Sequence, residues 1–430
     1  MIGRLTAVCM LACLFTALAR AEIVETKFDD GKVKQKYVTD EQGKKDGAFT
    51  EFFANGKVKI KAVYKADELD GLFTEYFENG KARISATYKA DKKNGTFTEF
   101  NEQGQKLVVA SYKDDKLNGV MTRMEKGVIT LQLPFKDGEP AYPRTKEQMA
   151  KKIQEILEAP VKGDGLDAER QEALKRLKAY RYICELPYEQ LTLDDQYNKL
   201  AQAGSALCAK IKRLDHKPAN PGLPEAEYKI GFEGTSKSNL AGGYAKIALS
   251  VDGYMDDSDP SNINRVGHRR WCLNPFMGKT GFGREGTFSA MYSMDASNQR
   301  PPDFDYIAYP TKGWMPIEFF SRGRIAPGAV NTYAWSVSLH PQKYKAADKN
   351  VKVRIFELDD AGSKKTSEPL PLNYNTPNGE GMGLRNCLIF RPDKFKLEAG
   401  QRFLVEIDGL VRPNGALAPI RYVVDFFSLK

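Results

Sequence analysis

Aromatic and polar residues alternate in short runs between residues 46 and 117, and the whole pattern recurs every 24 residues. In the first copy, Phe49–Phe53 alternates as a half-buried strand does, Asn55-Gly56 is a tight-turn dipeptide, and Lys57–Tyr64 predicts the return strand. The positions in register are Gly47, Gly71, Gly95 and Gly119; Phe49, Phe73 and Phe97; Gly56, Gly80 and Gly104; and Tyr64, Tyr88 and Tyr112. Because one hairpin cannot bury its own aromatic face, we expect the copies to stack into an extended sheet.

Helical spacing replaces this alternation after a linker with glycine and proline at Lys136–Pro143. The predicted helices are Lys146–Leu157, Ala168–Tyr182 and Leu191–Leu214. Thr192 or Asp194 is expected to cap the third of them, and Asp215-His216 to close it. The pattern therefore predicts a helical domain after the hairpins.

Strand composition returns from about Pro301 onwards. The predicted strands are Asn331–His340, Val351–Leu358, Cys387–Arg391, Arg402–Ile407 and Arg421–Leu429. Clusters of Pro, Asn and Gly at Asn373–Gly383 and Arg412–Gly415 are expected to separate strands. This spacing predicts a small β-sandwich over residues 301–430.

The composition is that of an ordinary globular protein, with 430 residues, 41% hydrophobic residues and 28% charged residues. The net charge of +9 permits contact with anionic partners. The basic residues are spread along the chain, however, and no nucleic-acid-binding motif accompanies them. We therefore expect no nucleic acid partner.

The N-terminus has the pattern of a secretory signal peptide. Leu5–Leu18 is nearly all apolar, follows the positive charge of Arg4, and precedes small residues at Ala19 and Ala21. The apolar run is shorter than the roughly 20 residues that a membrane span needs, and no later segment is long and apolar enough. We expect cleavage before Glu22 and a secreted or periplasmic protein without a transmembrane segment.

Cys9 and Cys13 would leave with the signal peptide, and four cysteines would remain: Cys184, Cys208, Cys272 and Cys387. Export makes disulfides chemically feasible, and four cysteines allow three complete pairings. The pair nearest in sequence is Cys184–Cys208; the alternative is that all four are small buried hydrophobic residues. Their spacing does not predict a zinc site.

One of the three histidines lies in the segment Val266–Gly283, VGHRRWCLNPFMGKTGFG. His268 precedes two arginines and Trp271, and Asn274-Pro275 then ends the element. The imidazole is thus expected at an element boundary, where binding and catalytic sites are often built. The alternative is a structural histidine beside a packed tryptophan.

The hairpin copies resemble MORN repeats, in the variant often labelled an antitoxin component. The resemblance covers about a quarter of the chain, and degenerate copies on each side extend the array to residues 22–135. It implies a scaffold, or a surface that binds proteins or lipids. We expect the aromatic residues to pack in a core rather than form a ligand platform, and export argues against an antitoxin role.

The helical domain resembles the CAP superfamily of cysteine-rich secretory, antigen-5 and pathogenesis-related proteins, in a bacterial version. The segments that carry the resemblance are LTLDDQYNKLAQAGSALCAK, DH, SKSNLAGG, VDGYMDD, VGHRRWCLNP and TGFG, in this order. It covers roughly residues 144–300 and implies an α-β-α sandwich with an open cleft. Some bacterial CAP proteins also carry a sandwich that ends in a strand similar to Tyr422–Phe427.

The resemblance implies two histidines and two acids in the cleft, sometimes around a divalent cation. His216 and His268 match the family histidines, Ser238 replaces the first acid, and Asp257, three residues after Tyr254, matches the second. The cleft residues implied by the resemblance are His216, Ser238, Asn239, Tyr254, Asp257, His268 and Arg269.

His216, His268 and Asp257 would make a zinc site with three protein ligands and an open position, which suits water activation. The serine at position 238 removes one ligand and one negative charge, so we expect no cofactor. Ser238 beside either histidine would make a nucleophile–base pair, but its flanks lack the glycines of a nucleophile elbow, and a turn or capping role fits them better.

Two other charged groups also have two interpretations. Arg269, Arg270 and Lys279 could hold an anionic group near the cleft, or the arginines could stack on Trp271 and cap carbonyls. The acids in Asp256–Asp259 suggest calcium, but they lack the glycine and the distal glutamate of an EF-hand loop, so we expect solvated loop acids.

Together these patterns predict a multi-domain α+β protein. Its parts are a signal peptide (1–21), a MORN-like β-hairpin array (22–135), a CAP-like α-β-α sandwich (144–300) and an Ig-like β-sandwich (301–430). The expected function is a secreted, non-catalytic binding module for a lipid, a cell-wall glycan or a protein. The alternatives are a metal-assisted or histidine-dependent extracellular hydrolase and a purely structural surface protein; Ser238 in place of the acid favours binding over catalysis.

Overall fold

The computed structural model describes residues 21–299, 303–320, 330–331, 333–393 and 395–430. The chain forms two compact units, which meet in the sequence at Pro140 and Ala141. Residues 1–20 of the predicted signal peptide, with Cys9 and Cys13, lie outside the described residues. No helix within the described ranges is long and apolar enough to cross a membrane.

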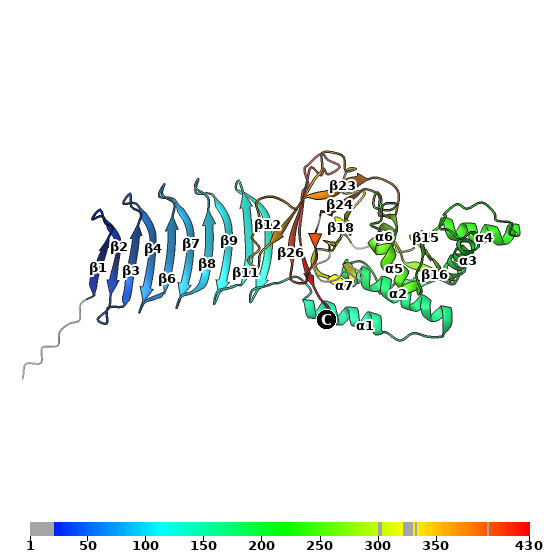
Figure 1. Ribbon diagram of the computed structural model, residues 1–430, viewed down its shortest axis with the longest axis horizontal. Helices are drawn as coiled ribbons and strands as arrows, with labels where there is room; N and C mark the ends of the chain where they lie inside the picture. The colour runs from blue at the N-terminus through cyan, green and yellow to red at the C-terminus, as the bar shows by residue number, and fades with distance from the viewer. Residues whose placement is uncertain (1–20, 300–302, 321–329, 332, 394) are drawn as a thin grey trace, which may run out of the picture. The chain divides into compact units, whose positions relative to one another are not determined.

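The first unit is one antiparallel sheet of 13 strands, built hairpin after hairpin in chain order (Figure 1). Its strands are β1 (Glu22–Lys27), β2 (Val33–Thr39), β3 (Lys45–Phe52), β4 (Val58–Lys65), β5 (Glu68–Leu69), β6 (Gly71–Tyr76), β7 (Ala82–Lys89), β8 (Lys92–Phe100), β9 (Lys106–Lys113), β10 (Lys116–Leu117), β11 (Gly119–Glu125), β12 (Val128–Lys136) and β13 (Glu139–Pro140). The unit ends at Pro140 rather than at residue 135, because β13 pairs with β12.

The repeated aromatic residues pack on one another across each hairpin. Gly47 is the cross-strand partner of Tyr64, and the Tyr64 ring packs edge-on against Phe49, with ring centroids 5.4 Å apart. The same contact recurs at 5.8 Å in the pairs Phe73–Tyr88 and Phe97–Tyr112. Packing within the sheet therefore accounts for the aromatic positions of the repeat.

A second repeated contact joins each hairpin to the one before it. Asp91 has left-handed backbone angles in a tight turn, where its N–H donates to the carbonyl of Leu69 at 3.0 Å and its carboxylate accepts from the Leu69 N–H at 2.7 Å. The same pair of bonds links Asp67 to Lys45 and Asp115 to Lys93. These aspartates bind neighbouring repeats together at a constant offset of 22 residues.

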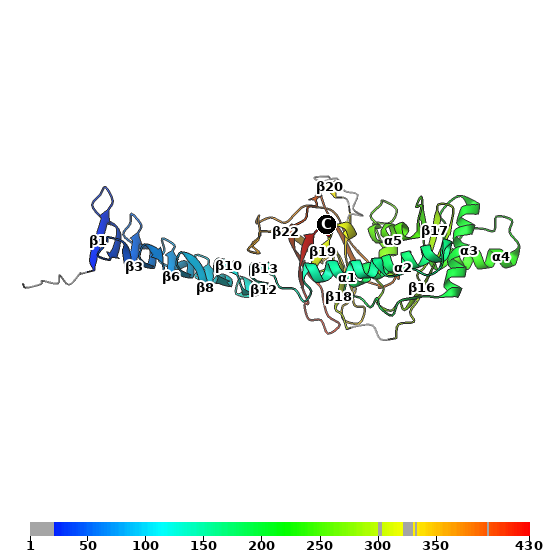
Figure 2. The same cartoon turned by 90° about the horizontal axis from the view of Figure 1, so that it is seen from below.

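Helices and a small sheet form the first part of the second unit (Figure 2). The helices are α1 (Lys146–Glu158), α2 (Gly165–Ile183), α3 (Asp195–Ile211), α4 (Glu225–Ser236), α5 (Ile247–Asp256) and α6 (Gly267–Cys272), and α7 (Ile317–Phe320) follows later. The sheet has the order β14 (Thr192–Leu193), β16 (Lys279–Glu285), β17 (Phe288–Tyr292) and β15 (Ser238–Gly242).

The three predicted helices are found as α1, α2 and α3, but α3 ends at Ile211, where Lys212 adopts a left-handed cap, so the predicted end at Asp215-His216 is wrong. Asp194 caps α3 by accepting from the N–H groups of Gln196 and Tyr197, whereas Thr192 lies in β14. Helices α4, α5 and α6 were not predicted. The α4 sequence is rich in glycine and charge, and α6 is only six residues long, so neither has a sustained apolar period.

Helical residues lie on both faces of this small sheet. On one face, α3 packs so closely on β16 that a Cβ on Gly283 would lie 2.3 Å from the backbone nitrogen of Gln202. Between Gly281 and Gly283, Phe282 points to the opposite face and joins the main core with Val251 and Tyr254 of α5. The glycines of TGFG are therefore required by close packing between a helix and a strand.

The rest of the second unit holds two four-stranded sheets and a short pair of strands. The first sheet has the order β18 (Tyr306–Tyr309), β21 (Trp335–Leu339), β24 (Cys387–Pro392) and β23 (Leu372–Asn378). The second sheet has the order β19 (Gly313–Pro316), β27 (Ile420–Phe427), β26 (Arg402–Asp408) and β22 (Lys352–Leu358). The short pair is β20 (Val330–Asn331) with β25 (Phe395–Lys396). Trp335 of the first sheet contacts Phe403 and Phe426 of the second, with ring centroids 6.0 and 6.1 Å apart, so the two sheets face each other.

The five predicted strands are found as β21, β22, β24, β26 and β27, but the predicted separator Asn373–Gly383 is wrong in part, because β23 runs through it. β23 is an edge strand, where Pro377 can be accommodated without losing a hydrogen bond inside the sheet. Buried residues of the helices and of both sheets form one continuous core. The predicted CAP-like and sandwich domains therefore belong to one compact unit, Ala141–Lys430.

Candidate functional site

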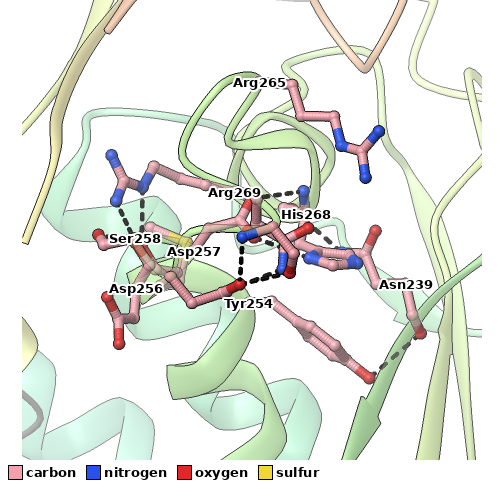
Figure 3. Close-up of polar contacts among 12 residues, drawn as sticks. Asn239, Tyr254, Asp256, Asp257, Ser258, Arg265, His268 and Arg269 are labelled. Carbon is pink, nitrogen blue, oxygen red and sulfur yellow. Dashed lines mark hydrogen bonds and ion pairs between the residues drawn. The ribbon is translucent and has the colours of Figure 1, made fainter. Parts of the chain in front are cut away.

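His268 is the second residue of α6, and its ring is held by Asp257, which follows α5 (Figure 3). One carboxylate oxygen accepts from His268 Nδ1 at 2.8 Å. The other accepts from the backbone N–H groups of His268 at 2.8 Å and Arg269 at 3.3 Å. The Asp257 side chain is 1% exposed and that of His268 is 19% exposed. Asp257 therefore caps the helix and orients the imidazole through Nδ1, so that Nε2 is not used in this contact.

His216 lies in the loop between α3 and α4, with its ring close to that of His268. Its Nδ1 donates to the carbonyl oxygen of Thr235 at 2.9 Å, and the Thr235 hydroxyl donates back to the His216 carbonyl at 3.3 Å. The ring centroids of His216 and His268 are 6.4 Å apart. His216 is exposed as a residue, but partial desolvation of its ring lowers the pKa of the imidazole, the bond to Thr235 opposes this shift, and the charge of Arg265 lowers the pKa further.

Tyr254 and Asn239 connect His268 to the sheet. The Tyr254 hydroxyl donates to the carbonyl of Asn239 at 3.1 Å, and the Asn239 side-chain amide donates to the carbonyl of His268 at 3.0 Å. The Tyr254 ring lies 5.6 Å from the His268 ring, and full burial raises the pKa of its hydroxyl. These two residues position α6 against β15, and the structure brings them together with His216, Asp257 and His268 as the sequence predicted.

Ser238 is buried in the edge strand β15, and its hydroxyl has no hydrogen-bond partner among the described residues. It is therefore not bonded to His216 or to His268. The residues present do not assemble the nucleophile–base pair that the sequence allowed.

Arg269 does not line this site, which corrects the sequence prediction. The side chain is fully buried and donates to the carbonyls of Met255, Asp256 and Ala334 and to the hydroxyl of Ser336. Its guanidinium lies over the Tyr309 ring, not over Trp271. Because Ala334 and Ser336 belong to the β21 region, Arg269 joins the helical part of the unit to the facing sheets.

Arg270 and Lys279 are also engaged elsewhere. Arg270 is buried and donates to the carbonyl of Leu384 and to the side chain of Asn378, and Lys279 pairs with Asp194 at 3.2 Å. The alternative interpretation, in which the arginines bond to carbonyls, is the correct one. Arg269 and Arg270, the two buried cations that follow His268, serve packing, because each satisfies several carbonyls that water cannot reach.

Arg265 is the residue that sequence reasoning missed. It lies in the turn before α6, is half-buried, and has no ion pair or side-chain hydrogen bond within the described part of the chain. Figure 3 shows its side chain extended beyond His268 with no bond to the other residues drawn. Its charge acts on His216. In the sequence, the one feature that could have pointed to Arg265 is its position three residues before His268.

The predicted metal ligands do not form a metal-binding group. Both carboxylate oxygens of Asp257 are bonded to α6, and the described residues contain no group of three His, Cys, Asp or Glu side chains arranged around one point. Asp259 does not join Asp257 in a calcium loop either; it accepts from Ser261 and Asn262 in a local turn. His216 and His268 alone could contribute ligands to a cation, through Nε2.

The predicted disulfide is wrong for this structure. Cys184, Cys208, Cys272 and Cys387 are all free and buried. Cys184 lies in the main core, whereas Cys208 of α3 packs in a separate cluster with Leu240 and Ala290. Two cysteines in separate clusters cannot be bridged, so the alternative of four small buried residues applies.

Comparison with known families supports the repeat part of the chain. A family model described as "MORN repeat variant" matches residues 45–66 and 69–90. These ranges coincide with β3–β4 and with β5–β7, so the repeats matched in sequence are the stacked hairpins of the structure. A search of curated proteins found no match to the chain.

Proposed function

We propose that the chain is a secreted or periplasmic binding protein whose second unit contains a domain of the CAP superfamily. Three observations support the assignment: the order of the short motifs, the helices on both faces of the small sheet, and the meeting of His216 and His268 at its edge. The ligand is a lipid, a cell-wall glycan or a protein, bound at the His216–His268 site, and the MORN-like repeats act as a scaffold.

The observation that favours binding over catalysis is the isolation of Ser238. Its hydroxyl makes no hydrogen bond to either imidazole, and the Nδ1 atoms of both histidines are used for positioning. A site with oriented imidazoles but no paired nucleophile can recognise a ligand without attacking it.

Binding of the full chain to phospholipid vesicles, wall glycans and peptides tests this function. A His216→Ala/His268→Ala double variant that keeps its circular dichroism spectrum should lose the ligand, while a His340→Ala variant should keep it. Unchanged binding by the double variant would place the ligand elsewhere and reject the proposal.

A histidine-dependent hydrolase is the second candidate, and the Asp257–His268 bond is the observation that favours it, because a carboxylate on Nδ1 leaves Nε2 as a general base. The test is hydrolysis of ester, amide and glycoside probes with and without added Zn²⁺. Turnover that disappears in His268→Ala but survives in His340→Ala would favour the hydrolase over the binding protein.

Export is tested at the N-terminus. We propose that the mature chain begins at Glu22, the first residue of β1. N-terminal sequencing of the protein recovered from outside the cytoplasm should start at this residue. Recovery of an uncleaved chain from the cytoplasm would reject the proposed location.

A further inference from the structure

Hydrogen bonding decides which nitrogen of each imidazole carries the proton. A backbone carbonyl and a carboxylate can only accept, so Thr235 and Asp257 each require a proton on the Nδ1 atom that faces them. In a neutral imidazole the other nitrogen, Nε2, is then an acceptor. Neither Nε2 has a partner among the residues that the structure describes. The His216–His268 pair therefore presents two hydrogen-bond acceptors.

Arg265 adds the opposite kind of group to the same site. A guanidinium has five N–H donors, no acceptor and a permanent positive charge. The Arg265 side chain has no bonding partner in the described ranges, and its charge acts on His216. The site thus combines two acceptors with one cationic donor.

We propose that this site binds an acidic glycan, with sugar hydroxyls donating to Nε2 of His216 and His268 and an anionic oxygen of the glycan accepting from Arg265. The inference rests on the proposed binding function and selects one ligand class from it. An acyl chain or an apolar peptide would leave all three polar groups without partners. A simple anion has no proton to donate, so it would be repelled by the lone pairs on the Nε2 atoms of the two histidines.

The charge distribution agrees with an acidic ligand. Lysine and arginine balance aspartate and glutamate between residues 22 and 140, so the excess that makes up the net charge of +9 lies outside the repeats. The unit that carries His216, His268 and Arg265 is therefore the basic part of the described chain, which favours the approach of an anion.

Two disaccharides that differ by one lactyl ether, which carries a carboxylate, test the proposal on the full chain. N-acetylglucosaminyl-N-acetylmuramic acid carries a lactyl carboxylate that di-N-acetylchitobiose lacks. In ¹⁵N spectra of the histidines, both sugars should shift the Nε2 signals of His216 and His268 and leave His340 unchanged. The acidic sugar should bind about tenfold more tightly, as one charge-assisted hydrogen bond predicts.

Two charge-neutralising variants separate the site from the overall charge. Arg265→Gln should remove the tenfold preference for the acidic sugar and retain the weaker binding of the neutral one. Lys349→Gln, which removes an exposed charge in the loop before β22, should keep the preference. If both variants lose the preference for the acidic sugar equally, Arg265 has no specific role and the preference reflects only the net charge of the protein.

Four further results would also overturn the proposal. Acetate or inorganic phosphate that binds as tightly as the acidic sugar would reduce the site to an anion site. Stoichiometric Zn²⁺ binding that shifts both Nε2 signals and blocks the sugar would make the histidines a metal site. If neither sugar shifts the signals but vesicles or peptides do, the glycan is wrong and the binding function survives; if no ligand shifts them, both fail.

Discussion

The carboxylate of Asp257 accepts two hydrogen bonds from His268, one from the ring Nδ1 and one from the backbone N–H, each 2.8 Å long. One side chain therefore sets both the start of α6 and the proton position on its histidine. A ligand that meets His268 meets Nε2 of a fixed ring. The predictions below follow from this contact, from its neighbours and from the repeats.

Asp257→Asn should reverse the tautomer of His268. Asp257 has left-handed backbone angles, with φ of 47°, which asparagine tolerates, so the local fold should survive. The asparagine oxygen can still accept from the backbone while its amide donates to Nδ1, which moves the imidazole proton to Nε2. Two-bond ¹H–¹⁵N spectra measure this change. A His268 that keeps the proton on Nδ1 would show that another group sets the tautomer.

The stability of the second unit should fall as the pH drops below about 6.5, in part through His216. Partial desolvation lowers the pKa of this imidazole in the folded state, so the unfolded chain binds the proton more readily. The free energy of unfolding should therefore decrease as the pH falls from the pKa of His216 in the unfolded chain to its pKa in the folded chain. At still lower pH this histidine should cause no further loss of stability. Urea unfolding at several pH values measures the slope, and His216→Asn, which can still donate to Thr235, should reduce it.

Asp91→Ala should weaken the contact between adjacent repeats by about 1–2 kcal/mol, because the N–H of Leu69 loses a charged acceptor and alanine is disfavoured at φ of 62°. Asp91→Asn keeps the acceptor and tolerates these angles, so it should change little. Hydrogen exchange in β5–β8 of the full chain measures the effect. Equal exchange in both variants would contradict a role for the carboxylate.

Arg269→Met should destabilise the second unit by about 3 kcal/mol or more, because it leaves the carbonyls of Met255, Asp256 and Ala334 buried without a donor. Arg265→Met serves as the control four residues earlier and should change stability by no more than about 0.5 kcal/mol. Denaturant unfolding followed by tryptophan fluorescence compares the two, since all three tryptophans lie in the second unit. Similar losses would contradict the structural role of Arg269.

Gly283→Ala should cost about 3 kcal/mol, because its Cβ would lie 2.3 Å from the backbone nitrogen of Gln202, and a helix backbone cannot yield cheaply. Gly379→Ala is the matched control, since nothing lies within 4 Å of its Cβ and its φ is not in the left-handed region. Thermal unfolding measures both. A neutral Gly283→Ala would mean that α3 packs less closely on β16 than described.

Local patterns account for the parts of the fold that the sequence predicted. The 24-residue period specifies strand, turn and return strand within each copy, because alternation and turn dipeptides act over a few residues. The helices α1 to α3 were found for the same reason. Helix α6 and strand β23 were missed, because a six-residue helix and a proline-containing edge strand owe their form to the core around them.

The roles of charged residues near the site depended on tertiary structure. His268, Asp257 and Tyr254 were identified from motif spacing and do lie together. Arg265 and Arg269 are both one turn or less from His268, yet one has no bonding partner in the described ranges and the other is fully buried. The sequence does not distinguish them, since the difference is made by Ala334 and Ser336, about 65 residues away.

By itself, the sequence determined the repeating hairpins, the main helices and the histidine motif, because these rest on interactions between residues close in the chain. The structure alone decided that four cysteines stay apart, that Arg269 joins helices to sheets, and that Ser238 has no partner among the described residues. It also decided the proton positions on His216 and His268, through Thr235 and Asp257. Such outcomes depend on which distant groups meet in the packed core, and a local pattern carries no information about that.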